Sequence, residues 1–479
     1  MLKIVLPQKV TYLLSQLMND GYEAYVVGGC VRDCLLGRVP KDWDITTSAK
    51  PEEVKAIFKR TVDTGIAHGT VTVMLEKEGF EVTTYRIDGE YEDNRHPKTV
   101  EFTRSLKDDL ARRDFTINAM AYNETDGFVD LFGGLEDIKN RQIRCVGTAT
   151  ERFEEDALRI LRAFRFSAQL DFEIEENTLI AAKELAERLQ GISAERVREE
   201  LIKLLLSDHP ERLLFVQQAG ITAIVLPEFD QMLEVTQENP HHCANVGIHS
   251  LNTVKWIAKQ EENADQKEMW NSAVIASGHS EKKCRLCLRL AALFHDVGKL
   301  NTKRIDEDGI AHFYGHDKEG AKQTQQILQR LKFDNETIEL VERLIFYHDY
   351  RYENLRHGLS ETGLRHMTNK AGKDLMELLF FLQEADARAQ SQKFLSEKLG
   401  ILNKARQIYY KIKEQGDCLR LKELAINGRD LIALGYMPGK NLGIILNEIL
   451  EYVLEHPEEN SKEKLLILAE KKRRQEQNL

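Results

Sequence analysis

The sequence predicts an α+β head, residues 1–145, followed by a long body that is helical throughout. Short runs of β-branched and aromatic residues are confined almost entirely to the first third of the chain, where glycine and polar turns separate them. Beyond about residue 150, apolar residues recur at helical spacing instead. Because 479 residues with 42% hydrophobic content can build several cores, we expect roughly three or four domains.

The expected elements follow from these two patterns in chain order. Apolar runs bounded by turn residues predict strands at Tyr25–Val27, Trp43–Thr46, Thr70–Leu75, Phe80–Tyr85 and Val100–Phe102. Apolar positions three and four residues apart predict helices at Glu155–Leu170, Ile180–Leu189, Ala194–Leu205 and Cys287–Phe294. The polar stretch Gln260–Gly278 predicts a loop or an insertion between helices.

Charge and cysteine content narrow the class of protein. A net charge of −11 and a pI of about 5.8 argue against indiscriminate nucleic-acid binding, although a local basic surface remains compatible with them. No apolar run approaches the length of a membrane span, and the apolar part of the N-terminal segment is too short for a signal peptide. The seven cysteines form no paired framework, which favours a reducing cytoplasm.

The most informative local pattern is a glycine pair followed by two carboxylates. A β-branched run ends at Gly28 and Gly29, a helix is expected to begin there, and Asp42 and Asp44 follow. Glycine lets backbone N–H groups approach an anion at a helix N-terminus, where the dipole favours phosphate. In a strand, residues i and i+2 face the same side, and two such carboxylates are stabilised by a hard cation such as Mg²⁺. The combination predicts a metal-dependent site for a nucleoside triphosphate.

Two further signals can complete this site within the head. Glu81 lies in an expected strand and can face the aspartate pair as the third carboxylate of a two-metal phosphoryl transfer. In the run Arg112–Ala119, the adjacent arginines are planar donors suited to phosphate, and Asn118 can contact a sugar hydroxyl.

A third signal lies at the start of the helical body. On a helix, Asp156 and Arg159 share one face, where an acceptor and a fork of donors can address the Watson–Crick edge of a base. Arg162 and Arg165 continue the same stripe toward phosphate or RNA. Taken alone, the stripe is better explained by an intrahelical salt bridge with a solvated basic face.

In this order, the motifs resemble those of the class II tRNA nucleotidyltransferase and bacterial poly(A) polymerase family. The resemblance is carried by Gly28–Asp33, Asp42-x-Asp44, Arg112–Ala119, Asp130–Gly134, Glu155–Arg162 and Ala194–Glu200, within residues 20–230. It implies a polymerase-beta-like head that adds C, C and A to the 3′ end of tRNA without a nucleic-acid template, with CTP, ATP and tRNA as partners.

The resemblance also implies roles for single residues. Asp42 and Asp44 bind the catalytic Mg²⁺, and Glu81 is the third catalytic carboxylate. The implied nucleotide-binding residues are Gly28, Gly29 and Arg32 at the triphosphate, Arg112 and Asn118 at the sugar and phosphates, Asp156 and Arg159 at the base, and Arg162 and Arg165 beyond them.

Several relatives differ in what they add. The segment Asp88–Pro97 resembles a flexible element that full CCA-adding enzymes have and CC-adding enzymes typically lack, so full CCA addition is favoured. Poly(A) polymerases of the family tend to be more basic, which disfavours that alternative. Addition of A alone, or of CC alone, stays open.

A second group of metal-ligand residues lies in the helical body. His295 and Asp296 are adjacent in an apolar helical pattern, where packing alone does not explain them. The ordered series resembles the HD metal-dependent phosphohydrolase superfamily, and this implies six ligands: His249, His295, Asp296, His316, His348 and Asp386. Lys299 would then lie near a substrate phosphate. The metal is divalent and of open identity, and the implied reaction is hydrolysis of cyclic or terminal phosphates.

Together the resemblances predict four domains. They are a nucleotidyltransferase head at 1–145, a helical neck at 146–236, an HD domain at 237–392 and a C-terminal helical tRNA-binding region at 393–479. A homodimer is left open, and no membrane partner is expected. The alternative from a different class is an HD phosphohydrolase whose head only binds nucleotide.

Overall fold

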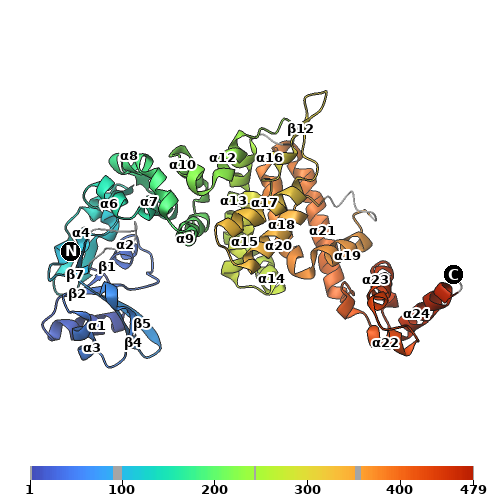
Figure 1. Ribbon diagram of the computed structural model, residues 1–479, viewed down its shortest axis with the longest axis horizontal. Helices are drawn as coiled ribbons and strands as arrows, with labels where there is room; N and C mark the ends of the chain where they lie inside the picture. The colour runs from blue at the N-terminus through green and yellow to red at the C-terminus, as the bar shows by residue number, and fades with distance from the viewer. Residues whose placement is uncertain (1–2, 90–99, 242–243, 351–357, 478–479) are drawn as a thin grey trace. The chain divides into compact units, whose positions relative to one another are not determined.

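The computed structural model describes residues 3–89, 100–241, 244–350 and 358–477 (Figure 1). The chain divides into two compact units, Met1–Pro227 and Glu228–Leu479. The expected head and most of the expected neck fall in the first unit, whereas neck residues 228–236 and the two remaining expected domains fall in the second. The flexible element expected at Asp88–Pro97 lies almost entirely outside the described residues.

The first unit is built on a seven-stranded mixed sheet with the strand order β3-β4-β5-β2-β1-β8-β9. These strands are β1 Ala24–Val27, β2 Ile45–Thr47, β3 Thr61–Gly65, β4 Thr70–Leu75, β5 Glu78–Thr84, β8 Met120–Asn123 and β9 Gly127–Asp130. Only the β2–β5 pair is parallel among the pairs of this sheet. A separate hairpin pairs β6 Arg86–Asp88 with β7 Val100–Phe102.

Side chains of the central strands alternate between two buried faces. Ala24 and Val26 of β1 pack with helices α1 (Gln8–Asn19) and α3 (Pro51–Ile57), which cover one face of the sheet (Figure 1). Tyr25 and Val27 point to the other face, toward α4 (Leu106–Ala111). This second face carries the candidate site, as the positions of its carboxylates show below.

After the seven-stranded sheet, the first unit continues in short helices. They are α5 Gly134–Lys139, α6 Ala149–Glu155, α7 Leu158–Leu170, α8 Glu176–Glu184, α9 Ala194–Leu205, α10 Leu213–Gln218 and α11 Thr222–Val225, with a two-stranded sheet of β10 Gln142–Ile143 and β11 Glu173–Ile174. The single helix predicted at Glu155–Leu170 was wrong at its start. The chain breaks at Asp156, whose backbone is extended at φ −147° and ψ 102°.

Among the residues of the second unit that the structure describes, regular structure is helical apart from one hairpin. Its helices are α12 Pro227–Glu234, α13 Val246–Glu262, α14 Lys267–Ser277, α15 Glu281–Phe294, α16 Lys299–Thr302, α17 His316–Arg330, α18 Asn335–Tyr347, α19 Glu361–Ala371, α20 Lys373–Ala389, α21 Leu395–Gln415, α22 Gly428–Ala433, α23 Lys440–Glu455 and α24 Lys462–Gln477. The hairpin pairs β12 Arg304–Ile305 with β13 Ala311–His312.

The loop predicted at Gln260–Gly278 is also wrong, because the segment forms the end of α13 and all of α14. Trp270 and Ala273 are buried there, and the Trp270 ring contacts Phe381 edge-on at 5.5 Å. Burial of these few apolar residues outweighs the polar composition of the segment. None of the helices in the described ranges combines the length and apolar character that a membrane crossing requires.

Candidate functional site

A glycine turn connects the central strand to the candidate site. Gly28 follows β1 with φ +82° and ψ −131°, and helix α2 (Gly29–Leu35) begins directly after it. The Gly28 N–H donates to the carbonyl of Met120 at 3.2 Å, which fixes the turn to the neighbouring strand. A residue with a Cβ would be strained at this φ, so the turn requires glycine.

We predicted that Asp42 and Asp44 lie inside a strand. In the structure both precede β2, which begins at Ile45. The Val27 N–H nevertheless donates to the Asp44 carbonyl at 3.0 Å, so Asp44 continues the ladder between β1 and β2. Partial burial raises the pKa of Asp44, the guanidinium of Arg113 lowers it, and the like charge of Asp42 raises it. The net upward shift shows that this position favours a nearby cation.

The sheet register places the third predicted carboxylate beside this pair. In the parallel β2–β5 pairing, Ile45 is opposite Val82, and both face the core. One residue earlier, the same register sets Asp44 beside Glu81, with both side chains on the opposite face. Strands in a sheet lie about 4.8 Å apart, so Asp44 and Glu81 are within reach of one ion. Together with Asp42, whose charge acts on Asp44, these carboxylates can supply the oxygen ligands that a divalent metal requires.

Arg113 belongs to the arginine pair of the motif, but the sequence reasoning assigned a nucleotide-binding role to Arg112 alone. A Cβ built on Gly28 would lie 3.1 Å from Nη1 of Arg113, and the same side chain acts on the charge of Asp44. Arg112, which the motif had favoured, instead donates to Asp109 through Nε at 3.0 Å and Nη2 at 2.7 Å. Arg113 is therefore the cation between the glycine turn and the carboxylates, where a triphosphate would lie.

A buried network joins three of the predicted nucleotide-binding residues. Arg32 Nη1 donates to Asn118 Oδ1 at 2.6 Å, and Asn118 Nδ2 donates to Asp114 Oδ1 at 3.1 Å. Arg162 donates to the other oxygen of Asp114 at 2.8 Å. The Phe166 ring lies beneath Arg32 and Arg162, at 5.1 and 5.6 Å from their guanidinium carbons.

The predicted base-reading pair is arranged differently from the expectation. Asp156 precedes α7 and caps it by accepting from the Leu158 N–H at 3.0 Å, while its other oxygen accepts from Arg196 at 2.7 Å. Arg159 lies inside α7 and donates to the backbone carbonyl of Arg112 at 3.1 Å. The two side chains therefore do not share a helical face.

Arg165 is buried and pairs with Glu200 at 2.8 Å, which packs α7 against α9. The structure thus shows Arg165 in a contact between two helices. Its role as a nucleotide ligand stays a prediction.

In the second unit, the six residues of the HD series converge. Asp296 lies in the turn after α15, with Oδ2 at 3.5 and 3.3 Å from Nε2 of His249 and His295. Its Oδ1 lies 3.6 and 3.9 Å from Nε2 of His316 and His348. Asp386 of α20 completes the first group, with its Oδ1 2.9 Å from His249 Nε2. Asp296 thus stands between two ligand groups.

Backbone carbonyls fix the orientation of three of these imidazoles. The Nδ1 atoms of His295, His316 and His348 lie 2.9, 2.8 and 2.6 Å from the carbonyls of Ala292, Phe313 and Ile345. Each ring therefore donates from Nδ1 and presents Nε2 to the centre, as metal-binding histidines do. Neighbouring Nε2 atoms approach to 3.2 and 3.3 Å, a repulsive contact unless a proton or a metal lies between them.

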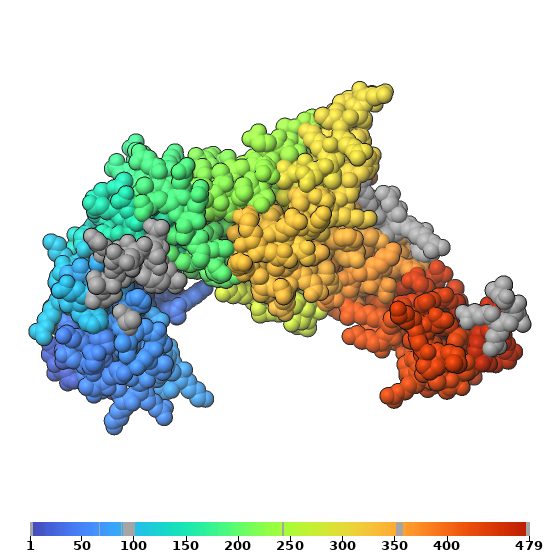
Figure 2. Space-filling view, in the orientation of Figure 1, coloured from blue at the N-terminus to red at the C-terminus, as the bar shows by residue number. Residues whose placement is uncertain are grey.

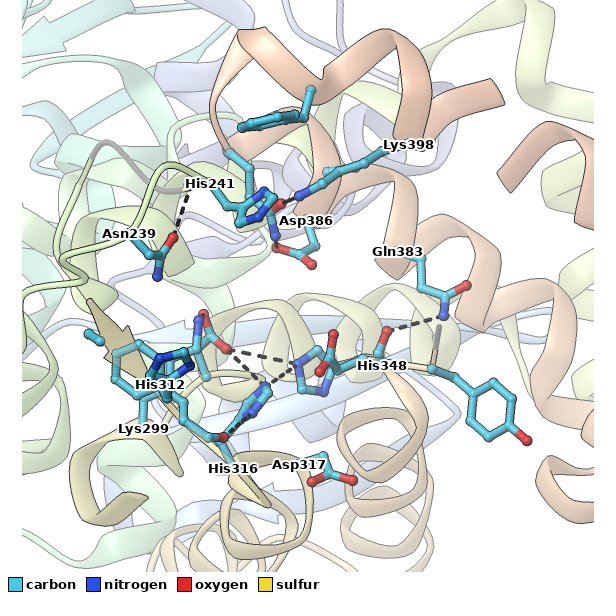
Figure 3. A pocket seen from close by; sticks show the side chains of 18 of the residues that line it. Asn239, His241, Lys299, His312, His316, Asp317, His348, Gln383, Asp386 and Lys398 are labelled. Atoms are coloured by element: carbon cyan, nitrogen blue, oxygen red, sulfur yellow. Dashed lines mark hydrogen bonds and ion pairs between the residues drawn. The ribbon is translucent and has the colours of Figure 1, made fainter. Parts of the chain in front are cut away.

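A pocket of about 1100 Å³ opens onto this cluster. Lys299 reaches into it and donates to Asp296 Oδ2 and to Gln237 Oε1, both at 2.7 Å. Figure 3 shows Lys299, His312 and His316 on one side of the pocket, with His241, Asp386 and Lys398 on the other. The residues fit a binuclear divalent-metal centre, because two possible ligand groups, one of His249, His295 and Asp386 and the other of His295, Asp296 and His348, share His295.

Comparison with known proteins places the chain in a family. The description "Poly A polymerase head domain" matches residues 24–144, "Probable RNA and SrmB- binding site of polymerase A" matches 171–233, and a tRNA nucleotidyltransferase domain 2 matches 306–469. A CCA-adding enzyme of Enterococcus faecalis is 36% identical over 465 residues, which cover 96% of this chain and 95% of the relative. The chain belongs to the CCA-adding enzyme family.

Other members of the CCA-adding enzyme family agree over almost the whole length. The enzyme of Levilactobacillus brevis is 34% identical and covers 92% of this chain and 91% of its own. The crystal structure of the Bacillus stearothermophilus CCA-adding enzyme in complex with CTP has a TM-score of 0.70 at 29% identity, covering 99% of this chain and 100% of that one. Nucleotidyltransferases of this family use a divalent metal.

The glycine turn can be tested by Gly28→Ala. The positive φ strains an alanine by about 1–3 kcal/mol, and its Cβ would press on Arg113. We expect a lower melting temperature together with weaker CTP binding, measured by calorimetry. Gly127→Ala is the matched control, since Gly127 also has a positive φ, of +77°, but no atom within 4 Å of a Cβ. Gly127→Ala should lose stability but keep its affinity for CTP. If Gly28→Ala and Gly127→Ala lost CTP affinity equally, the assignment of Arg113 would be contradicted.

The Asp114 network predicts a pH-dependent contribution to stability. Although burial raises the pKa of Asp114, Arg162 and Asn118 lower it far below its ordinary value. Asp114→Asn should therefore lower the free energy of unfolding at neutral pH by about 2 kcal/mol. This is less than the loss of a fully buried ion pair costs, because Arg162 remains partly exposed. A carboxylate whose pKa is lowered by folding stabilises the protein at pH values above its pKa in the unfolded chain, which is near 3.9. The difference in unfolding free energy between wild type and Asp114→Asn should therefore shrink below about pH 4. Urea unfolding across pH measures this, and a difference independent of pH would contradict the pairing.

Proposed function

We propose that this protein adds and repairs the 3′-terminal CCA of tRNA, using CTP and ATP, in the cytoplasm. The observation that carries the proposal is the sheet register that sets Asp44 beside Glu81, next to the glycine turn and Arg113, with Asp42 two residues before Asp44. The near full-length likeness to CCA-adding enzymes supports the same reaction.

Each part of the site has a task in this proposal. The carboxylates hold Mg²⁺, which activates the attacking hydroxyl and neutralises charge on the triphosphate when bound. Gly28 and Gly29 let the backbone approach the triphosphate, and the guanidinium of Arg113 offers it two planar donors. Arg32 and Asn118 are held together at 2.6 Å and orient the sugar. Base choice falls to Asp156 and Arg159, which flank the start of α7.

The carboxylate assignment predicts the outcome of an extension assay with tRNA lacking CCA, CTP, ATP and Mg²⁺. Asp42→Ala, Asp44→Ala and Glu81→Ala should each slow nucleotide addition by about 10³-fold or more, because metal-assisted stabilisation of the transition state is lost. Glu78→Ala is the control, since Glu78 lies on the same strand but pairs with Lys9 at its far end.

Product length in this assay separates the alternatives. Addition of CCA supports the proposal, unlimited adenylate would indicate a poly(A) polymerase, and products ending after CC or containing only A would indicate a partial enzyme. No extension by the wild-type protein would refute it.

A second candidate function is favoured by the convergence of the six HD residues. We propose that the second unit hydrolyses phosphate esters, such as 2′,3′-cyclic or terminal phosphates on RNA ends. Asp296 contacts both ligand groups, and Lys299, buried at 2.7 Å from Asp296, is a fixed cation for a substrate phosphate. Such an activity would prepare damaged ends for CCA addition.

The shared ligand predicts unequal effects on metal content. In an Asp42→Ala/Asp44→Ala background, we expect the second unit to bind about two Mn²⁺ per chain, as measured by elemental analysis. Asp296→Ala should lose both ions, whereas His316→Ala should keep about one, because His316 contacts only the second group.

Activity provides the complementary measurement in the otherwise unmodified chain. His295→Ala should abolish cyclic phosphodiesterase activity and spare CCA addition. His279→Ala is the control, since this histidine pairs with Glu336 outside the cluster. Loss of both activities in His295→Ala would contradict separate sites.

A further inference from the structure

An exposed tyrosine is held in a fixed orientation at the edge of the pocket in the second unit. Tyr314 follows the β12–β13 hairpin, which projects from the surface of this unit (Figure 2). It is 77% exposed, yet its ring lies parallel to that of His312, at 5° and 5.5 Å. His312 Nε2 lies 2.7 Å from Asp306, and its Nδ1 lies 3.4 Å from the Tyr314 hydroxyl. Asp306 thus sets the tautomer of His312, and His312 sets the position of Tyr314.

Such a ring costs free energy unless it has a ligand. An exposed aromatic side chain gains little from burial, and fixing its rotamer opposes its conformational entropy. At 5.5 Å between centroids the two parallel rings are offset-stacked, and most of the Tyr314 ring remains exposed to an outside partner. Flat π-systems are the ligands that prefer such a face, and stacking with a nucleobase is worth about 1–3 kcal/mol.

Tyr314 lies close in the chain to a residue of the metal cluster. Tyr314 precedes the ligand His316 by two residues, a span of at most about 7 Å between Cα atoms. Phe313, between them, orients His316 through its carbonyl at 2.8 Å and lies 5.1 Å from Lys299 Nζ. One short segment therefore joins the stacking ring, a metal ligand and the phosphate-binding lysine.

The size of the pocket also favours a nucleotide over a simple phosphate. At about 1100 Å³, it slightly exceeds the range for small-molecule ligand pockets, about 300–1,000 Å³. Its wall includes Tyr314 and His312, and also His241 and Phe394, whose rings lie 4.6 Å apart. Two aromatic sections thus border a space that inorganic phosphate would leave largely empty.

We propose that Tyr314, supported by His312, stacks on the nucleobase of the substrate whose phosphate reaches the metal cluster. This inference rests on the proposed phosphohydrolase function and names its substrate class as a nucleoside phosphate ester, either a free nucleotide or the 3′ end of an RNA.

The test measures fluorescence quenching of 2-aminopurine, whose emission falls on stacking, with the full chain and Mn²⁺. The probes are 2-aminopurine riboside 3′-monophosphate and a short RNA ending in the same nucleotide. Tyr314→Ala should weaken binding of the base-containing probe about tenfold or more, and Tyr314→Phe should stay within about threefold of wild type. Inorganic phosphate, measured by calorimetry, should bind all three proteins equally. Tyr12→Ala, at another exposed tyrosine, is the control.

Each outcome decides the inference. Unchanged binding in Tyr314→Ala, or an equal loss for inorganic phosphate, would overturn it. Tight binding of the RNA would identify an RNA end as the source of the nucleotide, and binding of the mononucleotide alone would identify a free nucleotide. If the wild-type protein binds no Mn²⁺ in the second unit, the proposed phosphohydrolase function is refuted without any conclusion about Tyr314. Quenching of 2-aminopurine riboside, which has no phosphate, then tests stacking on Tyr314 independently.

Discussion

The buried carboxylate of Asp114 is the interaction on which the first unit depends. It accepts from Asn118, which holds Arg32 of α2, and from Arg162 of α7. A buried charge is tolerated only when it is paired, so this one group forces the helix after the glycine turn and the first long neck helix into a fixed relation. The nucleotide site and the helix start that carries Asp156 are thereby positioned together.

Concentrated negative charge is the constraint that both sites share, and each is balanced by a cation of the chain itself. In the first unit, Arg113 lowers the pKa of Asp44 while Asp42 raises it. In the second, Lys299 lies 2.7 Å from Asp296, and Asp296 and Asp386 outweigh burial to raise the pKa of His295 to about 10. In both sites, negative charge on the carboxylates still favours a further positive charge after the chain's own cation is counted. Such sites are suited to divalent metals because full neutralisation by the chain would leave no electrostatic reason to bind them.

Prediction from sequence succeeded where local pattern and packing agree. The strand at Thr70–Leu75 and the helix at Ala194–Leu205 have the expected bounds, because alternation and helical spacing there coincide with the buried face. The helix predicted across Asp156 failed because its carboxylate caps α7 and ends the preceding helix. The loop predicted at Gln260–Gly278 failed because burial of Trp270 organises an otherwise polar segment.

The sequence by itself determined the chemistry: which carboxylates, glycines and histidines are present, and the order of motifs that places the chain among CCA-adding enzymes. Only the tertiary structure decided that Arg113 rather than Arg112 faces the glycine turn, since both can reach Asp109 from one helix. It also decided that histidines from separate helices share Asp296, and that Tyr314 stands beside them. Local spacing fixes neighbours along one helix or strand, whereas contacts between distant segments depend on how those elements pack.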